Sequence, residues 1–199
     1  MSTVYLPDHP REMLVSGADK YGWVQWCIIP GSFGNELYER VEDEFGVTFP
    51  PSFIDWHRSH FFLECDCSLV RLPASSPSRP LERLIKELDW DVAAELIQQK
   101  LYPFGSDGND VGPFVFDARV AVDGDEFPIR AYDHEFMGGL EGLSDIIFSS
   151  FPKLLECMTH YLNEIKTRSH PDAVRDFFKI DPEGAGKTGF KYWSMIAGI

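Results

Sequence analysis

The residues best suited to chemistry fall in four short stretches, and the first of them resembles a phosphate-binding loop. Gly184–Thr188 reads GAGKT, which is close to the end of the glycine-rich motif that cradles phosphates with backbone N–H groups. That motif requires a glycine five positions before Gly186, and the residue there is Asp181. A carboxylate at that position would repel phosphate, so we expect a turn here and no nucleotide site.

The second stretch resembles the opening of a calcium-binding loop. Asp107–Gly112 reads DGNDVG, but the fifth and twelfth positions of the loop would be Val111 and Ala118. A calcium loop needs an oxygen ligand at the fifth position and a bidentate acid at the twelfth. The sequence therefore favours a turn in which Asx side chains bond to the nearby backbone.

The third stretch holds four soft metal ligands within a short distance, namely His57, His60, Cys65 and Cys67. Such a set could bind zinc. However, the two histidines lie in a segment rich in aromatic residues, where packing in the core is the commoner outcome. The Cys-x-Cys spacing is also tighter than the usual Cys-x-x-Cys of zinc sites. We expect packed side chains and no metal.

The fourth stretch, Asp133-His134-Glu135, could supply an acid–base pair, because a carboxylate beside an imidazole raises its pKa. Neighbouring residues in a strand point to opposite faces, which favours exposed side chains over a pair. We find no Ser/His/Asp or Cys/His arrangement elsewhere. The sequence therefore predicts neither an enzyme nor a bound cofactor.

The segment Leu101–Tyr132 is expected to form the centre of the fold and to position these residues. Gly105–Asp110 is a glycine-rich acidic turn, and Pro113–Asp117 is an aromatic and β-branched run typical of a buried strand. Asp123–Gly124 is a hairpin turn, and Phe127–Tyr132 alternates as a second strand does. We expect a β-meander in a mixed domain.

Helices and loops are expected around this meander, with boundaries set by glycine, proline and capping residues. The predicted elements are a strand over Trp23–Ile29, a helix from Glu36 to Gly46, a second helix over Ser52–Ser59 with Pro51 at its first position, one or two strands within Phe61–Leu72, a loop over Ala74–Pro80, helical periodicity over Leu81–Lys100, a flexible loop over His134–Leu143, a long helix capped by Ser149 or Ser150, and a short helix over Pro171–Phe178.

Charge is the strongest compositional signal. The 199 residues carry 32 acids and 18 bases, a formal net charge of −14. Residues 36–66 and residues 107–135 each hold eight acids and two bases, whereas residues 166–199 hold six bases and four acids. Such a balance repels nucleic acid and anionic membrane and attracts a basic partner over a distance. A soluble surface is the plainer interpretation of the same charge.

Three further features of the sequence bear on the cellular compartment in which the protein is expected. We find neither a run of about 18 apolar residues nor the basic start and apolar core of a signal peptide. The four cysteines, at positions 27, 65, 67 and 157, lack the rhythm of a disulfide framework and are expected to be buried thiols. We expect a cytoplasmic protein.

The order of these motifs resembles that of the SUKH superfamily, the Smi/Knr-type proteins that include yeast cell-wall regulators and bacterial toxin-immunity proteins. An acidic helix is followed by Gly-Val-x-Phe-Pro-Pro, an aromatic helix, Phe-Gly-x-Asp-Gly, a strand that ends in Asp, and a terminal helix. The residues that match are Glu42, Gly46, Phe49, Pro50, Phe53, Ile54, Phe104, Gly105, Asp107, Gly108, Phe116, Asp117, Phe151 and Leu155. The resemblance covers about residues 35–165. The Asn-Gly turn that usually follows the second helix is replaced here by Ser59-His60-Phe61-Phe62.

This resemblance implies an α+β fold, an antiparallel sheet with helices packed on it. It divides the chain into an N-terminal segment (1–34) that contributes a strand, a Smi/Knr-like domain (35–166) and a C-terminal extension (167–199). It implies binding and not catalysis: a cytoplasmic immunity-type protein that occludes the active surface of a cognate basic toxin domain, for which a nuclease is the natural candidate. The alternatives are a regulator or scaffold of the cell-wall type and, as a third hypothesis, a small hydrolase.

The acids near the central turns are the predicted partner-binding residues, because charge on turns steers a basic partner toward the surface. They are Asp107, Asp110, Asp123, Asp125, Glu126, Asp133 and Glu135. Phe104 and Tyr132 are expected either to anchor the partner or to lie in the core.

Overall fold

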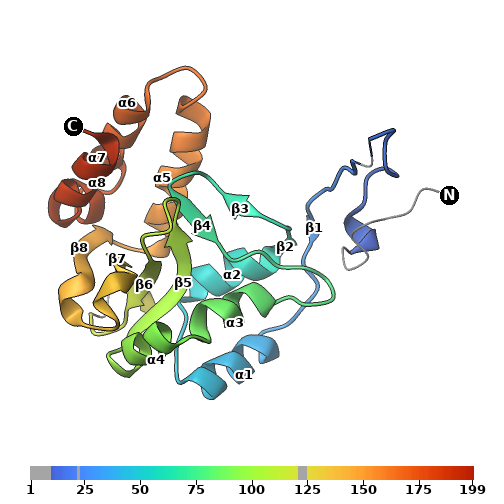
Figure 1. Cartoon of the computed structure of the whole chain (residues 1–199), viewed down its shortest axis with the longest axis horizontal. Coiled ribbons are helices and arrows are strands. Elements are labelled where there is room, and N and C mark those ends of the chain that lie inside the picture. The colour runs from blue at the N-terminus through green and yellow to red at the C-terminus, as the bar shows by residue number, and fades with distance from the viewer. Residues whose placement is uncertain (1–9, 22, 121–124) are drawn as a thin grey trace.

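The computed structural model describes residues 10–21, 23–120 and 125–199, which form an antiparallel sheet flanked by helices (Figure 1). The six strands follow one another in the order β3-β4-β5-β6-β7-β8, and each pairs with its neighbour antiparallel. The α+β prediction is therefore confirmed. The strands are β3 (Cys65–Asp66), β4 (Val70–Leu72), β5 (Leu101–Asp107), β6 (Pro113–Asp117), β7 (Ile129–Tyr132) and β8 (Leu143–Phe148).

The helices surround this sheet, and the longest of them is α5. Their bounds are α1 (Glu36–Phe45), α2 (Pro51–Ser59), α3 (Glu82–Leu88), α4 (Asp91–Gln98), α5 (Phe151–Glu164), α6 (His170–Arg175), α7 (Phe177–Ile180) and α8 (Phe190–Ala197). Short single turns are η1 (Arg11–Met13), η3 (His134–Phe136) and η4 (Leu140–Gly142). No helix within the described part of the chain has the length and apolar character needed to cross a membrane.

The predicted meander is present, with one change at its first turn. Strand β6 has the predicted bounds, and Ile129–Tyr132 forms β7 within the predicted second strand. Gly105 and Asp107 belong to β5, so the turn begins only at Gly108. The predicted hairpin turn at Asp123–Gly124 lies outside the described residues.

Alternation along the strands gives the sheet two apolar faces. On the first face, Phe104 and Phe116 stack with centroids 3.9 Å apart and meet Phe53 of α2 and Phe151 of α5 at 5.5–6.1 Å between ring centroids. On the second face, a smaller cluster joins strand residues to α4. It consists of Val92, Leu96, Leu101, Val115 and Tyr132.

The predicted helical segment Leu81–Lys100 is two helices. Leu84 and Leu88 of α3 belong to the main core, whereas Leu96 of α4 belongs to the second cluster. One straight helix cannot bury both sets of side chains, and the backbone of Trp90 between them is extended (φ −155°, ψ 160°). The break is thus a consequence of tertiary packing.

The N-terminal segment contributes less strand than predicted. The only strand within Trp23–Ile29 and its surroundings, among the residues described, is β1 (Ile29–Pro30), which pairs with β2 (His60–Phe61) in a separate two-stranded sheet. Trp26 forms an isolated bridge to Leu14.

The C-terminal residues cover the β8 edge of the sheet. Trp193 donates its indole N–H to the carbonyl of Ile147 (2.9 Å), and the Thr188 hydroxyl donates to the carbonyl of Ile146 (2.7 Å). Phe177 and Trp193 are buried in the same core as the sheet. Residues 167–199 therefore protect an edge that would otherwise be open to pairing with another chain.

The stretch that resembles a phosphate loop is one turn of π-helix, η5 (Gly184–Thr188). The buried carboxylate of Asp181 accepts the backbone N–H groups of Gly184 (3.1 Å) and Ala185 (3.3 Å), and it also binds the backbone N–H and hydroxyl of Ser149. The protein's own carboxylate thus holds the N–H groups that a phosphate loop would offer to its ligand.

Candidate partner-binding surface

The six predicted acids that the structure describes do not form one surface, because the sheet topology divides them between its two ends. The β5–β6 turn, with Asp110, and the β7–β8 connection, with Asp133 and Glu135, lie at the same end, since Ser106 pairs with Pro113 and Tyr132 pairs with Leu143. The β6–β7 connection, with Asp125 and Glu126, lies at the opposite end. Asp123 lies outside the described residues.

Asp107 is not displayed to solvent, which corrects its predicted role as a steering charge. Its side chain is 5% exposed, and its carboxylate accepts the backbone N–H groups of Asn109 (2.7 Å) and Gly112 (2.8 Å). The acid therefore closes the turn from inside, as Asx residues do. The sequence that resembles a calcium loop is this turn.

Asp110 is exposed, but a cation from β4 lies against it. Its backbone is left-handed (φ +59°), and its carboxylate forms an ion pair with Arg71. Arg71 also pairs with Asp66 (2.9 Å) and donates to the carbonyl of Gly108 (3.0 Å). Hydrogen bonds from the Ser68 N–H and from Arg71 lower the pKa of Asp66.

The β7–β8 connection was predicted to be a flexible loop, yet several hydrogen bonds fasten it. The Tyr132 hydroxyl accepts the N–H of Gly138 (2.7 Å) and donates to the carbonyl of Gly139 (3.1 Å). Gln99, just after α4, donates to the carbonyl of Gly138 (2.9 Å). The Asp133 carboxylate caps η3 by accepting the N–H of Glu135 (3.0 Å). A loop held in this way loses little conformational freedom when it binds.

This connection also displays apolar side chains that the sequence analysis did not single out. Phe136 is 45% exposed, Met137 70% and Leu140 49%, and Val111 of the neighbouring turn is 50% exposed. The N–H of His134 donates to the carbonyl of Val111 (3.2 Å), which brings the two segments together. The sequence signal was the run Glu135-Phe136-Met137 next to two glycines.

We call this region the turn surface. It comprises Asp110, Val111, Asp133, His134, Glu135, Phe136, Met137, Leu140 and Glu141. Exposed apolar residues rimmed by polar ones mark protein-interaction sites, and an acidic rim is complementary to a basic partner. Asp110, Asp133 and Glu135 of the predicted set belong to it, and Glu141 is an addition.

The two aromatic residues considered as anchors lie in the core. Phe104 and Tyr132 are both buried, Phe104 within the aromatic stack and Tyr132 in the smaller cluster under α4. Tyr132 still affects the turn surface, because its hydroxyl holds the loop on which Phe136 and Met137 are displayed.

At the opposite end of the sheet, two acids form hydrogen bonds or ion pairs within the fold. Glu126 accepts the N–H of Ser52 (3.3 Å) at the first turn of α2. The nearby Asp117, at the end of β6, is buried and pairs with Arg119 and Arg130, each at 2.7 Å. Burial by itself would raise the pKa of Asp117, but hydrogen bonds from the two arginines bring it below its usual value. Asp125 is exposed and has a left-handed backbone (φ +61°).

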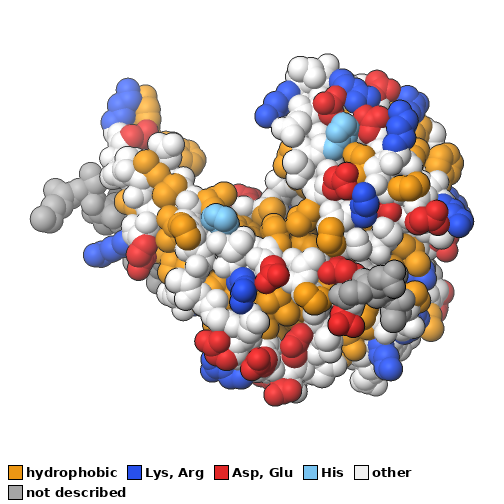
Figure 2. All heavy atoms as spheres, turned by 180° about the vertical axis from the view of Figure 1, so that it is seen from behind, with side chains coloured by type: hydrophobic (Ala, Val, Ile, Leu, Met, Phe, Trp, Pro, Cys, Tyr) orange, Lys and Arg blue, Asp and Glu red, His pale blue; other side chains and the backbone are white. Residues whose placement is uncertain are grey.

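A second group of acids lies on α1, where Figure 2 shows acidic side chains gathered along the lower edge of the molecule. Glu36, Glu39, Asp43 and Glu44 are exposed there. The apolar residues of α1 face the core and none of its large ones is exposed, so this helix offers charge without an apolar anchor.

The residues considered for zinc do not gather into a site. His57 is buried, and its Nδ1 lies 2.6 Å from the Tyr38 hydroxyl, while the exposed His60 contacts the Ser59 hydroxyl (3.0 Å). Burial lowers the pKa of His57 from 6.5 to about 4. Within the described part of the chain, no group of three or more His, Cys, Asp or Glu residues could hold a metal ion.

Comparisons with known proteins add no relative. A scan against protein-family models gave no match, and searches of curated proteins and of solved structures gave none.

Proposed function

We propose that this chain is a binding protein that docks on a basic partner protein through the turn surface. The observation that carries the proposal is the fastened β7–β8 connection, on which Phe136, Met137 and Leu140 are exposed among acids. Apolar side chains supply affinity when a partner buries them, and the surrounding carboxylates supply orientation and fast encounter. The net charge of −14 favours approach of a cationic partner from any direction.

We further propose that the partner is a toxin domain and that binding blocks its active surface. This step is supported by the resemblance of the motif order to toxin-immunity proteins and by the chemistry of nucleases. A nuclease must display positive charge to hold phosphate, and an acidic protein can bind the same positively charged surface. The turn surface would compete with the nucleic acid for that surface.

The test takes as its partner a basic protein that co-purifies with this chain from its native operon and measures stopped-flow association at several salt concentrations. A triple variant, Asp110→Asn with Glu135→Gln and Glu141→Gln, removes charge from the turn surface. Its control, Glu36→Gln with Glu39→Gln and Asp43→Asn, removes the same charge from α1.

We expect the turn-surface triple to slow association about tenfold at low salt and the α1 triple to slow it much less. Phe136→Ala should mainly raise the dissociation rate, at a cost of about 2 kcal/mol. An association rate that does not change with salt, or an equal response of both triples, would contradict the proposal. Loss of toxin inhibition in parallel with lost binding would support the second step.

A further inference from the structure

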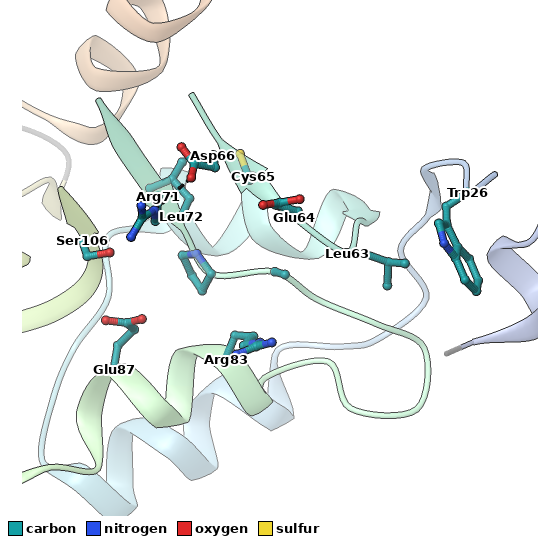
Figure 3. A pocket seen from close by; sticks show the side chains of 12 residues that line it. Trp26, Leu63, Glu64, Cys65, Asp66, Arg71, Leu72, Arg83, Glu87 and Ser106 are labelled. Atoms are coloured by element: carbon teal, nitrogen blue, oxygen red, sulfur yellow. Dashed lines mark hydrogen bonds and ion pairs between the residues drawn. The ribbon is translucent and has the colours of Figure 1, made fainter. Parts of the chain in front are cut away.

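A hollow of about 720 Å³ lies between the β3–β4 hairpin and α3 (Figure 3). Glu64, Asp66 and Arg71 come from the hairpin side, Arg83 and Glu87 from α3, and Ser106 from β5. Trp26 of the N-terminal segment stands at the far end. The hollow adjoins the turn surface, because Arg71 forms one of its walls and also pairs with Asp110.

The strand pattern explains why this hollow is polar. Val70 and Leu72 of β4 are buried in the main core, so Arg71 between them points to the other face. Ser106 is directly opposite Arg71 in the β4–β5 register and shares that face. Both side chains thus line the hollow because alternation directs them away from the core.

The charged side chains of the hollow differ in whether they already form ion pairs within the chain. Arg71 is held by Asp66, Asp110 and the Gly108 carbonyl. Glu87 is half-buried, and within the described part of the chain no ion pair reaches its carboxylate. Arg83, one turn away on α3, acts on Glu87 only at a distance, and burial raises the pKa of Glu87. Figure 3 shows Glu87 pointing toward Ser106 and the strands, with Glu64 on the hairpin side.

We propose that the hollow receives one guanidinium side chain of the bound partner, with Glu87 as its main acceptor and Glu64 as a second. This inference rests on the proposed function. A guanidinium fits because its planar fork of N–H donors pairs with a carboxylate in a bidentate way. An anion fits less well, because the three carboxylates of Glu64, Asp66 and Glu87 outnumber the guanidinium groups of Arg71 and Arg83 in the hollow, and the Arg71 donors are already engaged.

The test needs no partner. The probe is N-acetyl-arginine methylamide, its neutral isostere N-acetyl-citrulline methylamide is one control, and inorganic phosphate is the other. NMR of side-chain carboxyl carbons follows Glu87 through a pH titration together with Glu64 and Asp66, which also face the hollow. The guanidinium carbons of Arg71 and Arg83, the two cations that face the hollow, are followed in parallel.

We expect the arginine probe to shift the Glu87 resonance and to lower the pKa of Glu87, and the citrulline probe to do neither, because only a cation favours the carboxylate form. Glu87→Gln should weaken binding of the arginine probe about tenfold. Glu82→Gln, on the same helix but paired with Arg79 and Lys86 outside the hollow, should not change it. Thermal unfolding of both variants checks that they fold.

Equal binding of both amides, phosphate shifts at Arg83, or an unchanged Glu87→Gln would overturn the inference. The two proposals fail separately. If the turn-surface triple weakens the partner complex and Glu87→Gln does not, only the hollow loses its role. If the turn-surface triple has no effect on the complex, the proposed function fails whatever the probe does.

Discussion

The Tyr132 hydroxyl lies 2.7 Å from the backbone nitrogen of Gly138, and this contact joins the end of β7 to the middle of the loop that follows it. The same hydroxyl donates to the carbonyl of Gly139. The buried side chain of Tyr132 thus holds the segment on which Phe136 and Met137 are exposed. The turn surface therefore depends on a residue that is itself buried.

Tyr132→Phe should therefore loosen the loop without disturbing the sheet. The phenyl ring still fills its place, but the N–H of Gly138 loses its acceptor, which costs about 1–2 kcal/mol. We expect a lower free energy of unfolding in urea and faster amide exchange at residues 138 and 139. Tyr102→Phe, another buried tyrosine on the sheet, is the control. Unchanged exchange at Gly138 would show that the hydroxyl does not hold the loop.

The buried pair of Tyr38 and His57 predicts a pH dependence of stability. Burial lowers the pKa of His57 from 6.5 to about 4. Between these two pH values His57 is therefore protonated in the unfolded chain and neutral in the folded chain. Stability contributed in this way is complete above pH 6.5 and falls as the pH drops toward 4, by at most about 1.4 kcal/mol per pH unit.

The measurement is the free energy of unfolding of the native chain and of His57→Gln between pH 7.5 and pH 5. Carboxylates with lowered pKa values, such as Asp66 and Asp117, lose their contribution at more acidic pH. The native chain should lose more stability than the variant across this range. If the free energies of unfolding of the native chain and of His57→Gln change with pH in parallel, His57 takes up its proton as readily in the folded chain as in the unfolded chain.

Local sequence signals predicted the elements whose cause is local. The aromatic and β-branched run Pro113–Asp117 favours a buried strand, and all five residues are buried in β6. Gly46 ends α1 with a left-handed backbone (φ +68°), as expected of a glycine at that position. Pro152 in the first turn of α5 gave the start of that helix. Each of these features depends on a few neighbouring residues.

Features set by tertiary contacts escaped prediction. Asp107 and Asp110 belong to the same acidic stretch at the β5–β6 turn and have the same local sequence character, yet Asp107 is buried and Asp110 is exposed. The hydrogen bonds that Asp107 accepts within the turn distinguish the two. The separation of Asp133 from Asp125 follows from strand direction, which charge counts do not contain. The exposure of Phe136 and Met137 was missed because aromatic and sulfur side chains are normally assigned to the core.

Asp181→Asn should release the C-terminal helices from the β8 edge. The carboxylate accepts two N–H groups of η5 together with the N–H and hydroxyl of Ser149, two of these hydrogen bonds on each oxygen. Asn keeps one acceptor oxygen, but its amide nitrogen cannot accept the two hydrogen bonds of the oxygen that it replaces. We expect a loss of about 2–3 kcal/mol in the free energy of unfolding and earlier cleavage after residue 181 in limited proteolysis.

Glu183→Gln is the matched control for that variant, since Glu183 is exposed and pairs only with Lys187 among the described residues. It removes the same charge two residues away. If both variants resist the protease as well as the native chain does, the buried carboxylate does not hold the segment.

Arg71→Gln should affect the association rate in the opposite direction to the variants that remove negative charge from the turn surface. The guanidinium of Arg71 lies against Asp66 and Asp110, so its loss leaves both carboxylates unpaired beside the turn surface and strengthens the negative field there. We expect association with the basic partner to become severalfold faster at low salt, and the rate to fall more steeply as salt is added. Arg83→Gln changes the net charge equally, but no ion pair within the described chain joins Arg83 to an acid of the turn surface, so its effect should be smaller. An association rate for Arg71→Gln no faster than that of Arg83→Gln would place the docking site away from Asp110, because the freed carboxylates give no advantage at a distant site.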